Sequence, residues 1–387
     1  MKKMRIGFYT DTYLPNVDGV VSQVLASKKE LERRKHYVHV FTPGTLSEKR
    51  ANRDKTVSYY TGVKFPLYSQ YKLALFPFAS VFECKKRNIE LIHCHALATM
   101  GVASIATAKA LRLPLVGTFH TMVPLAMHYV TSNLRYQDLL SSAAWKVIEA
   151  FYTPFDIVTA PSHVIAALLE QHGVENVKVV SNGIDTQLFN SRVAGSQTKR
   201  KLGIKSDEKV FVFVGRMTRE KQVDVLLRAF AKLKNENKGD DAKLLIIGDG
   251  PAFSEVKTLS RKLGLKNVVF TGNVKHDELS NYLAACDWQV SASNFETQGI
   301  GILEGMACGK PCVGANALAI PETVKENYNG LLFKSLDVDD CAAKLETALE
   351  MSGKKYSSLC KGATLTGKKH SVEITVNAWE EIYNSVL

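Results

Sequence analysis

The sequence has no stretch of about 18 consecutive apolar residues, so it predicts no helix that crosses a membrane. Its seven cysteines are an odd number without paired spacing, which favours a reducing compartment over a disulfide-stapled secreted fold. The first ten residues are basic and then apolar, but the apolar run is too short for a signal peptide. We therefore expect a globular protein of the cytoplasm.

Two kinds of sequence motif are also missing. The first predicted strand is not followed by Gly-x-Gly-x-x-Gly, which counts against an enzyme that uses a nicotinamide dinucleotide. No Asp-x-Asp cluster predicts a divalent cation, and Asp240-Asp241 lies in a polar loop. The run His93-Cys94-His95 falls on a predicted strand, where neighbouring side chains point to opposite faces, so it does not predict a metal site. We expect neither a metal ion nor an organic cofactor.

The composition is that of a globular chain. Of its 387 residues, 45% are hydrophobic and 23% are charged, which predicts two or three domains with ample core. The formal net charge of +12 favours anionic partners such as phosphates, nucleic acid or acidic lipid headgroups. Residues 1–190 hold 22 Lys and Arg against 14 Asp and Glu, so the first half is the more basic one.

Short β-branched runs alternate with longer helix-compatible stretches, a pattern typical of parallel sheets covered by helices on both faces. One series of strands is predicted at residues 5–10, 37–41, 91–94, 115–119, 157–160 and 177–181. A second series is predicted at residues 210–214, 244–247, 268–271, 288–291 and 312–314. Two such series predict an α/β fold of two Rossmann-like domains, with a hinge near residues 182–185.

The most informative segment covers residues 294–311. A loop after a predicted strand continues into an apolar helix, so Glu296 is expected on the loop and Glu304 inside the helix. Between them, Gly299–Gly301 leaves bare N–H groups at the positive end of the helix, which suits a phosphate. Carboxylates accept hydrogen bonds strongly and suit sugar hydroxyls. The segment therefore predicts a nucleotide-sugar site; the alternative is one glutamate that caps the helix and one that is solvated.

A basic turn at residues 214–221 is a second candidate. Arg216 and Lys221 stand five positions apart where a strand ends and a helix begins, so both side chains can face one anion. Without a metal ion, the charge that develops on a leaving diphosphate needs such cations. The alternative is an exposed basic turn.

These segments are similar to those of retaining glycosyltransferases of family four, which have the GT-B fold of two Rossmann-like domains facing a cleft. The likeness is strongest at residues 5–20, 115–121, 181–189, 213–221 and 247–315. It implies an acceptor-side domain at residues 1–185, a nucleotide-sugar domain at 186–369, and a terminal helix at about 370–387 that returns to the first domain. It also implies retention of the anomeric configuration without a metal ion or other cofactor.

The resemblance implies roles for single residues. Glu296 would hold hydroxyls of the transferred sugar, Glu304 the ribose, and Arg216 with Lys221 the diphosphate. His120 would stabilise the sugar near its 6-hydroxyl and would not act as a nucleophile. Further donor contacts would come from Gly19, Asn273, Val274, Gly299, Ile300 and Gly301. Residue 18 is Asp where many relatives have Gly, so Gly19 alone of this pair is assigned to the diphosphate.

Segments 18–21 and 296–299 look most like those of enzymes that glucosylate diacylglycerol, which favours UDP-glucose as the donor and a membrane lipid as the acceptor. Residues 64–87 mix aromatic side chains with Lys85, Lys86 and Arg87, and such a segment could hold the protein on an anionic membrane surface. The alternative for this segment is a core helix with a solvated basic end. A soluble sugar or sugar-phosphate acceptor is the alternative function, and a non-catalytic nucleotide- or nucleic-acid-binding protein is the remote one. We expect no nucleic acid partner.

Overall fold

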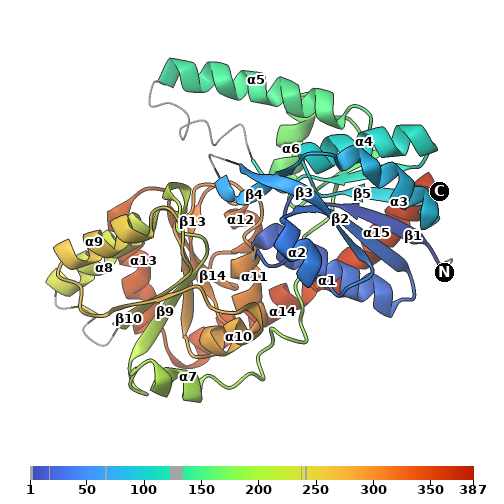
Figure 1. Cartoon of the computed structure of the whole chain (residues 1–387). Helices are drawn as coiled ribbons and strands as arrows, with labels where there is room; N and C mark the ends of the chain where they lie inside the picture. The colour runs from blue at the N-terminus through green and yellow to red at the C-terminus, as the bar shows by residue number, and fades with distance from the viewer. Residues whose placement is uncertain (1–2, 17, 66–67, 123–133, 237, 240–241) are drawn as a thin grey trace. The chain divides into compact units, whose positions relative to one another are not determined.

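A computed structural model of the chain describes residues 3–16, 18–65, 68–122, 134–236, 238–239 and 242–387. The chain divides into two compact units (Figure 1). The N-terminal unit consists of Met1–Gly183 and Val372–Leu387, and the C-terminal unit of Ile184–Ser371. The sequence placed the first boundary at residue 185 and the return at about residue 370. Each unit is described by itself.

The N-terminal unit is built on an eight-stranded sheet with the order β4-β3-β2-β1-β5-β6-β7-β8. Its strands are β1 (Arg5–Tyr9), β2 (Tyr37–Gly44), β3 (Val57–Phe65), β4 (Tyr68–Ala74), β5 (Leu91–Cys94), β6 (Leu115–Thr118), β7 (Ile157–Ala160) and β8 (Val177–Val179). Its helices are α1 (Gly19–Arg33), α2 (Leu46–Ala51), the 3₁₀ turn η1 (Pro77–Ala79), α3 (Ser80–Lys86), α4 (Thr99–Leu111), α5 (Leu134–Tyr152), α6 (His163–Gln171) and α15 (Val372–Val386). Neighbouring strands are parallel except β3 and β4.

Successive residues of β1 face opposite sides of this sheet, as the pleat requires. Ile6 and Phe8 lie in one apolar cluster with side chains of α1 and α15. Tyr9 faces the other side, where its hydroxyl lies 3.3 Å from the thiol of Cys84 in α3. The unit therefore has helices on both faces of its sheet, with α1 and α15 on one face and α3 and α4 on the other (Figure 1).

Buried charges hold the last helix, α15, to the N-terminal unit. The Glu380 carboxylate, 2% exposed, lies 2.8 Å from His36 Nε2 and accepts a second hydrogen bond from Arg34. Arg34 also donates to Glu30 of α1 at 2.7 Å. A buried carboxylate without such partners would be strongly destabilising, so these contacts fix where the end of the chain packs.

The C-terminal unit has a six-stranded, all-parallel sheet with the order β11-β10-β9-β12-β13-β14. Its strands are β9 (Lys209–Val214), β10 (Ala242–Ile247), β11 (Val268–Gly272), β12 (Trp288–Ser291), β13 (Cys312–Asn316) and β14 (Gly330–Lys334). Its helices are α7 (Ser196–Lys201), the 3₁₀ turn η3 (Arg219–Lys221), α8 (Val223–Asn235), α9 (Phe253–Lys262), α10 (His276–Ala284), α11 (Ile300–Ala307), α12 (Ile320–Thr323), α13 (Val338–Glu350) and α14 (Gly353–Lys369).

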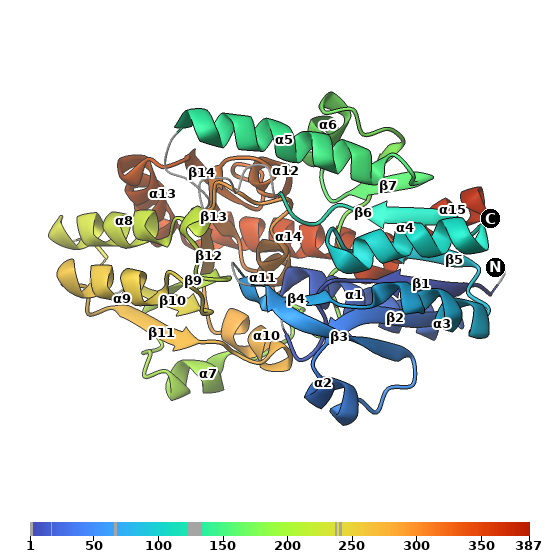
Figure 2. The same cartoon turned by 45° about the horizontal axis from the view of Figure 1, so that its top comes forward.

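The central strand β9 is apolar on both faces because both faces are covered. Val210 and Val212 pack with side chains of α10 and α11. Phe211 and Phe213 pack on the opposite face with side chains of α8. Figures 1 and 2 show α8, α9 and α13 on one side of the sheet and α10, α11 and α14 on the other. This alternation is the reason why the strand appears in the sequence as a continuous apolar run.

The predicted α/β fold of two Rossmann-like sheets is confirmed. Three strands were not predicted: β3, β4 and β14. The alternative of a core helix across residues 64–87 is wrong, because this stretch contains the end of β3, then β4, η1 and α3. Strand β4 pairs antiparallel with β3 at the edge of the sheet, and the aromatic residues of this stretch favour a strand over a helix.

The sequence also predicts reduced cysteines and no membrane-spanning helix. All seven cysteines are free, six of them buried and Cys360 half-buried. None of the helices in the described part of the chain combines the length and the apolarity that a bilayer span requires.

Candidate functional site

Two candidate segments of the sequence meet at the carboxyl ends of β9 and β12, which are neighbours in the C-terminal sheet. The loop after β9 carries Arg216 and ends in η3, and the loop after β12 carries Glu296 and leads into α11. The ammonium group of Lys221 donates a hydrogen bond to Glu296 Oε1 at 2.7 Å. This ion pair joins residues 75 positions apart and was not predicted.

Backbone contacts hold the same two loops together. The carbonyl oxygen of Glu220 accepts hydrogen bonds from the N–H of Asn294 at 3.2 Å and from the hydroxyl of Ser293 at 3.3 Å. The Lys221 and Glu296 side chains are 20% and 18% exposed, so they are shielded from bulk water and still accessible to a ligand. The ion pair is therefore positioned by both side chains and backbone.

Helix α11 begins directly beside this ion pair. Gly299 precedes it with a φ of +85°, in the left-handed region that favours glycine. A Cβ atom on Gly301 would lie 3.2 Å from the carbonyl oxygen of Val214, so the first turn packs closely on the end of β9. Ile300 is the first helical residue and is half-buried. The positive end of a helix and two cationic side chains therefore belong to one edge of the sheet.

Glu304 lies one turn further along α11 and is 6% exposed. Burial raises the pKa of its carboxyl group from 4.5 to about 8, so the folded protein keeps it protonated at pH 7. A neutral carboxyl group can both donate and accept hydrogen bonds, which suits vicinal hydroxyls. The structure therefore places the two glutamates in different states, Glu296 paired with an ammonium group and Glu304 neutral.

The loops after β9 and β10 touch through their backbones. The N–H of Met217 donates to the carbonyl oxygen of Asp249 at 2.9 Å. A Cβ atom on Gly250 would lie 2.4 Å from the carbonyl oxygen of Met217, so only glycine permits this approach. Asn273 and Val274 follow the edge strand β11; Asn273 is exposed, and Val274 packs against the apolar cluster under α10.

In the N-terminal unit, Gly19 is the first residue of α1 and Asp18 caps the helix. The Asp18 carboxylate accepts hydrogen bonds from the N–H of Val21 at 2.9 Å and from the hydroxyl of Thr12 at 3.1 Å. Asp18 is therefore the N-cap of α1. Its negative charge already occupies the positive end of α1.

His120 follows β6 and is half-buried. Its Nε2 lies 2.9 Å from Nδ1 of His95, which follows the neighbouring strand β5. Burial lowers the pKa of His120 from 6.5 to about 4, so the ring is neutral at pH 7. The run His93-Cys94-His95 suggests only a metal ligand for His95; its place just after a strand, at the same sheet edge as His120, is the signal that was missed.

Asp11 is a second missed residue at this edge. It is 7% exposed, follows β1, and its carboxylate accepts hydrogen bonds from the N–H groups of Leu97, Ala98 and Met100 at 2.6–3.1 Å. These bonds fix the start of α4 to the end of β1.

The structure thus brings Lys221, Glu296 and the start of α11 together in the C-terminal unit, whereas Gly19 and His120 belong to the N-terminal unit.

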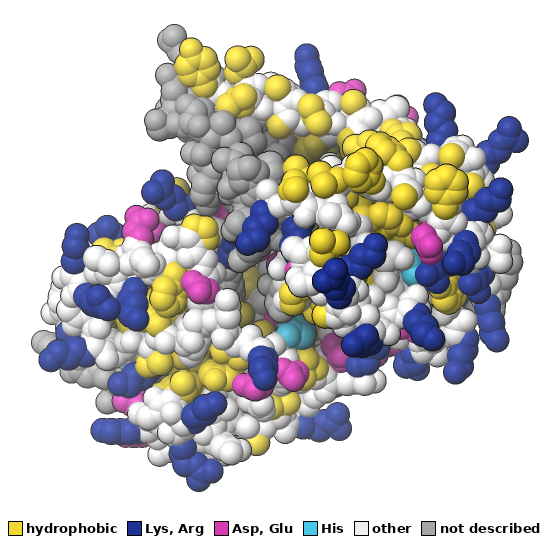
Figure 3. Space-filling view, in the orientation of Figure 1, with side chains coloured by type: hydrophobic (Ala, Val, Ile, Leu, Met, Phe, Trp, Pro, Cys, Tyr) yellow, Lys and Arg dark blue, Asp and Glu magenta, His cyan; other side chains and the backbone are white. Residues whose placement is uncertain are grey.

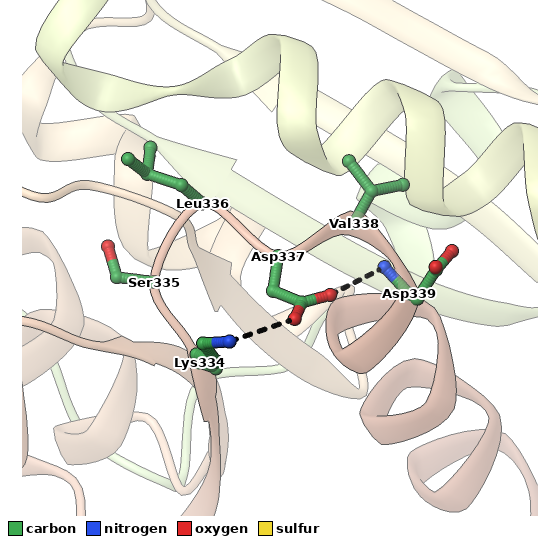
Figure 4. A pocket seen from close by; sticks show the side chains of 6 residues that line it. All are labelled: Lys334, Ser335, Leu336, Asp337, Val338 and Asp339. Atoms are coloured by element: carbon green, nitrogen blue, oxygen red, sulfur yellow. Dashed lines mark hydrogen bonds and ion pairs between the residues drawn. The ribbon is translucent and has the colours of Figure 1, made fainter.

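Within the described ranges, no group of three or more His, Cys, Asp or Glu is placed to hold a metal ion. Asp240 and Asp241 lie outside the described residues. A shallow hollow between β14 and α13 is lined by residues 334–339 and contains no predicted site residue (Figure 4). There the carboxylate of Asp337 lies 3.8 Å from the ammonium group of Lys334 and accepts hydrogen bonds from the first N–H groups of α13. Its charge therefore stabilises the N-terminus of that helix.

Comparisons with known proteins were made for the whole chain. Residues 17–188 match the model of Glycosyltransferase Family 4, and residues 196–365 match that of Glycosyl transferases group 1. The alpha-monoglucosyldiacylglycerol synthase of Streptococcus pneumoniae is 30% identical over 85% of this chain and 75% of that protein. A synthase of the same name from Acholeplasma laidlawii is 28% identical over 98% of this chain and 96% of that protein.

Other relatives carry different names. The GDP-mannose-dependent alpha-mannosyltransferase of Corynebacterium glutamicum is 28% identical over 94% of this chain and 84% of that protein. Among solved structures, HepE of Anabaena with UDP and glucose has a TM-score of 0.80 at 23% identity, covering 99% of this chain and 100% of that one. Sucrose-phosphate synthase of Thermosynechococcus elongatus has a TM-score of 0.82 at 19% identity, covering 99% of both chains. At these identities the two structures establish the fold.

The buried carboxyl group of Glu304 predicts a pH-dependent stability. Its folded-state pKa of about 8 exceeds the ordinary 4.5, so the folded protein binds this proton more tightly and loses stability as pH rises between the two values. Glu304→Gln cannot ionise. Its melting temperature should equal that of the parent near pH 4 and exceed it by several degrees above pH 8, at roughly 2–4 °C per kcal/mol. Glu350→Gln, exposed at the end of α13, is the matched control; parallel pH curves for parent and Glu304→Gln would contradict the assignment.

Proposed function

The chain belongs to the family 4, group 1 glycosyltransferases, and on that premise we propose that it transfers a hexose from a nucleotide-sugar to a membrane lipid. The proposed donor is UDP-glucose, the proposed acceptor is a diacylglycerol, and the anomeric configuration is retained. The donor site rests on one observation above all, the ion pair of Lys221 and Glu296 beside the start of α11.

The ion pair suits both halves of a sugar diphosphate. An ammonium group has three donors, so Lys221 can keep its hydrogen bond to Glu296 and donate to a phosphate oxygen as well. Arg216, in the preceding loop, adds a guanidinium group that can hold two phosphate oxygens. The N–H groups at the start of α11, over Gly299–Gly301, add the positive end of a helix. Together they compensate the charge of the leaving diphosphate without a metal ion.

The remaining donor contacts follow from the same arrangement. A carboxylate accepts about four hydrogen bonds, so Glu296 can hold sugar hydroxyls beside Lys221. The neutral carboxyl group of Glu304 would bind the ribose hydroxyls, and Asn273 with Val274 would meet the base. From the N-terminal unit, His120 would hold the transferred sugar near its 6-hydroxyl.

We propose that the donor phosphate itself takes the acceptor proton. The bond from the anomeric carbon to the phosphate oxygen breaks as the acceptor hydroxyl enters on the same face, and the departing oxygen accepts the hydroxyl proton. The chain then supplies positioning and electrostatic stabilisation, and a protein base is not required. This mechanism leaves the cations Arg216 and Lys221 as the groups on which the rate depends most directly.

The lipid acceptor is supported by an exposed aromatic surface in the N-terminal unit. Phe76, Phe78 and Phe82 are 77%, 55% and 76% exposed, and the nearby Lys85 and Lys86 are exposed as well. Figure 3 shows hydrophobic side chains gathered over the region of α3 and α4, with Lys and Arg side chains around it. Aromatic rings beside basic side chains are typical of proteins that bind at anionic lipid surfaces.

Arg87 does not belong to this surface, although the sequence grouped it with the two lysines. It is half-buried, and its guanidinium group donates to Glu83 at 3.0 Å and to the hydroxyl of Tyr37 at 3.3 Å. The side chains of Phe65, Tyr68 and Tyr71, three further aromatic residues of segment 64–87, lie outside the described part of the structure.

A soluble acceptor and a GDP-mannose donor are the alternatives, favoured by the names of relatives that are about as similar as the synthases. The direct test incubates the protein with labelled UDP-glucose or GDP-mannose and with diacylglycerol vesicles or soluble sugars. Labelled glucosyl-diacylglycerol of α configuration would support the proposal. Label in a soluble product alone would refute the lipid acceptor.

We expect substitutions of Glu296 and Glu304 to impair different steps, sugar transfer and nucleotide binding. Glu296→Ala should nearly abolish transfer while UDP still binds, because the carboxylate contacts the sugar side. Glu304→Ala should weaken UDP binding, because it removes the contact to the ribose. Calorimetry with UDP and the transfer assay separate these effects, with Glu278→Ala, exposed on α10, as the control. If both variants bound UDP and transferred sugar like the parent, the donor site would lie elsewhere.

Lys221→Met should lower kcat by roughly ten- to a thousandfold, the range for a lost transition-state stabiliser, because it removes the ammonium group and keeps much of the volume. Lys262→Met, exposed at the end of α9, should leave kcat unchanged. Arg216→Ala should fall in the same range as Lys221→Met. Turnover should also survive EDTA, and an absolute need for added Mg²⁺ or Mn²⁺ would argue against the proposed charge compensation.

We expect the protein to co-sediment with vesicles that contain acidic lipid, less so with neutral vesicles, and to be released by salt. The double change Lys85→Glu/Lys86→Glu should weaken this association, since each basic residue near an anionic surface contributes about 1 kcal/mol. The matched control Lys354→Glu/Lys355→Glu changes the net charge equally on α14 of the C-terminal unit. Equal loss in both double variants would point to net charge alone, and no loss in either would remove the physical support for a lipid acceptor.

A further inference from the structure

Gln289 is a buried amide that contacts the helix at the start of the candidate donor site. It lies in β12, is 3% exposed, and its backbone is in register with Val212 of β9 and Cys312 of β13. Its side-chain Nε2 donates a hydrogen bond of 2.6 Å to the carbonyl oxygen of Gly301 in α11. The side chain therefore connects the centre of the sheet to the first turn of α11.

Two glycines of α11 make room for this side chain. Gly301 and Gly305 are four positions apart, so they lie on one face of the helix. A Cβ atom on Gly305 would lie 2.1 Å from Gln289 Nε2 and 2.2 Å from its Cδ, so an alanine there would displace the amide from Gly301. The amide of Gln289 and the glycine face of α11 are therefore matched to each other.

Packing alone does not explain an amide at this position. Gln289 Oε1 is buried and has no hydrogen-bond partner within the described part of the chain, and an unpaired polar atom costs stability. In an α-helix the carbonyl oxygen of Gly301 already accepts from the N–H four residues further on, so it does not require the amide. An apolar side chain of similar length would fill the space without an unpaired oxygen. The amide adds a second bond that fixes the carbonyl group of Gly301.

This bond falls on the turn that offers N–H groups to a ligand. The N–H groups of Ile302 and Leu303 donate to the carbonyl oxygen of Gly299 at 2.9 and 3.2 Å. Those of Ile300 and Gly301 come first in the helix, where helix geometry supplies no acceptor. A turn with two glycines has more backbone freedom than other turns. A side-chain bond from the sheet restricts that freedom.

We propose that Gln289 is a positioning residue for the donor: its amide holds the first turn of α11, so that the N–H groups of Ile300 and Gly301 keep the direction in which they meet a phosphate. This inference rests on the proposed function, in which the start of α11 binds the diphosphate of the nucleotide-sugar. Gln289 is enclosed by the sheet and α11, so it acts through the helix and not through a ligand contact of its own.

The substitution Gln289→Met separates positioning from packing, because it keeps the length of the side chain and removes the amide. It also removes the unpaired Oε1, so the melting temperature should equal or exceed that of the parent. The Kd of UDP should nevertheless rise roughly three- to tenfold, the scale of one hydrogen bond, whereas the Kd of uridine, which lacks phosphates, should not change. Titration calorimetry of the full chain measures both values.

Gln23→Met is the matched control. Gln23 of α1 is 1% exposed, its Nε2 donates to the hydroxyl of Ser27 at 3.0 Å, and its Oε1 likewise has no partner among the described residues. The control removes the same groups in the N-terminal unit and should leave both Kd values unchanged. A parent-like Kd of UDP in Gln289→Met would overturn the proposal. An equal loss for UDP and uridine would also overturn it, because the amide would then support α11 as a whole.

A second set of variants changes the contact from the side of the helix. Gly305→Ala places a methyl group where the amide lies, so it should melt lower than the parent and bind UDP more weakly. Gln289→Val/Gly305→Ala removes the clash and should recover most of the melting temperature, while the affinity for UDP stays low. If the affinity returned together with the stability, close packing would explain the contact, and the amide would have no role of its own.

Amide hydrogen exchange in the protein without ligand separates this inference from the proposed function. In Gln289→Met the N–H groups of Ile302 and Leu303 should exchange roughly three- to tenfold faster than in the parent, while those of α10 exchange as before. Unchanged exchange at Ile302 and Leu303 would overturn the inference. If the parent did not bind UDP, the proposed donor site would be refuted, and the exchange rates alone would decide whether Gln289 holds the first turn of α11.

Discussion

The candidate donor site of the C-terminal unit depends on the ion pair of Lys221 and Glu296. It ties the loop after β9 to the loop after β12, and the 2.7 Å bond is partly shielded from water, so salt screens it less than a surface pair. A bare carboxylate near a diphosphate would repel it. The ammonium group of Lys221 compensates the charge of this carboxylate. Glu296 can then face sugar hydroxyls while the positive group next to a phosphate is Lys221.

Both units place their polar groups at the carboxyl ends of parallel strands. In the N-terminal unit Asp11, His95 and His120 follow β1, β5 and β6, which are consecutive in the sheet. In the C-terminal unit Lys221 and Glu296 follow β9 and β12, also neighbours. Most strand side chains are apolar, and a polar one such as His93 is buried and bonded inside the core. The strand ends are where a polar side chain can remain accessible while its backbone is fixed by the sheet.

The features that could be predicted from the sequence are those that a local pattern of residues determines. Apolar runs revealed the central strands, and the glycines between Glu296 and Glu304 indicated a loop that turns into a helix. The edge strand β4 has a mixed sequence and the edge strand β14 has an apolar run of only three residues, so neither was predicted. The pairing of Lys221 with Glu296 depends on the strand order, in which β12 lies beside β9 although two strands intervene in the chain. No local pattern encodes that order, and the contact of His95 with His120 was missed for the same reason.

Glu304 and His95 are polar residues at buried positions, and an apolar side chain at either position would stabilise the fold more. Burial keeps the Glu304 carboxyl protonated, and it leaves His95 Nε2 without a hydrogen-bond partner among the described residues. Each is neutral at pH 7, so each offers hydrogen bonds without adding charge. In the proposed donor site, Arg216, Lys221 and the start of α11, all three positive, would compensate the charge of a leaving diphosphate. The proposed transfer, which binds hydroxyls and releases an anion without a metal ion, would need this division between neutral and cationic groups.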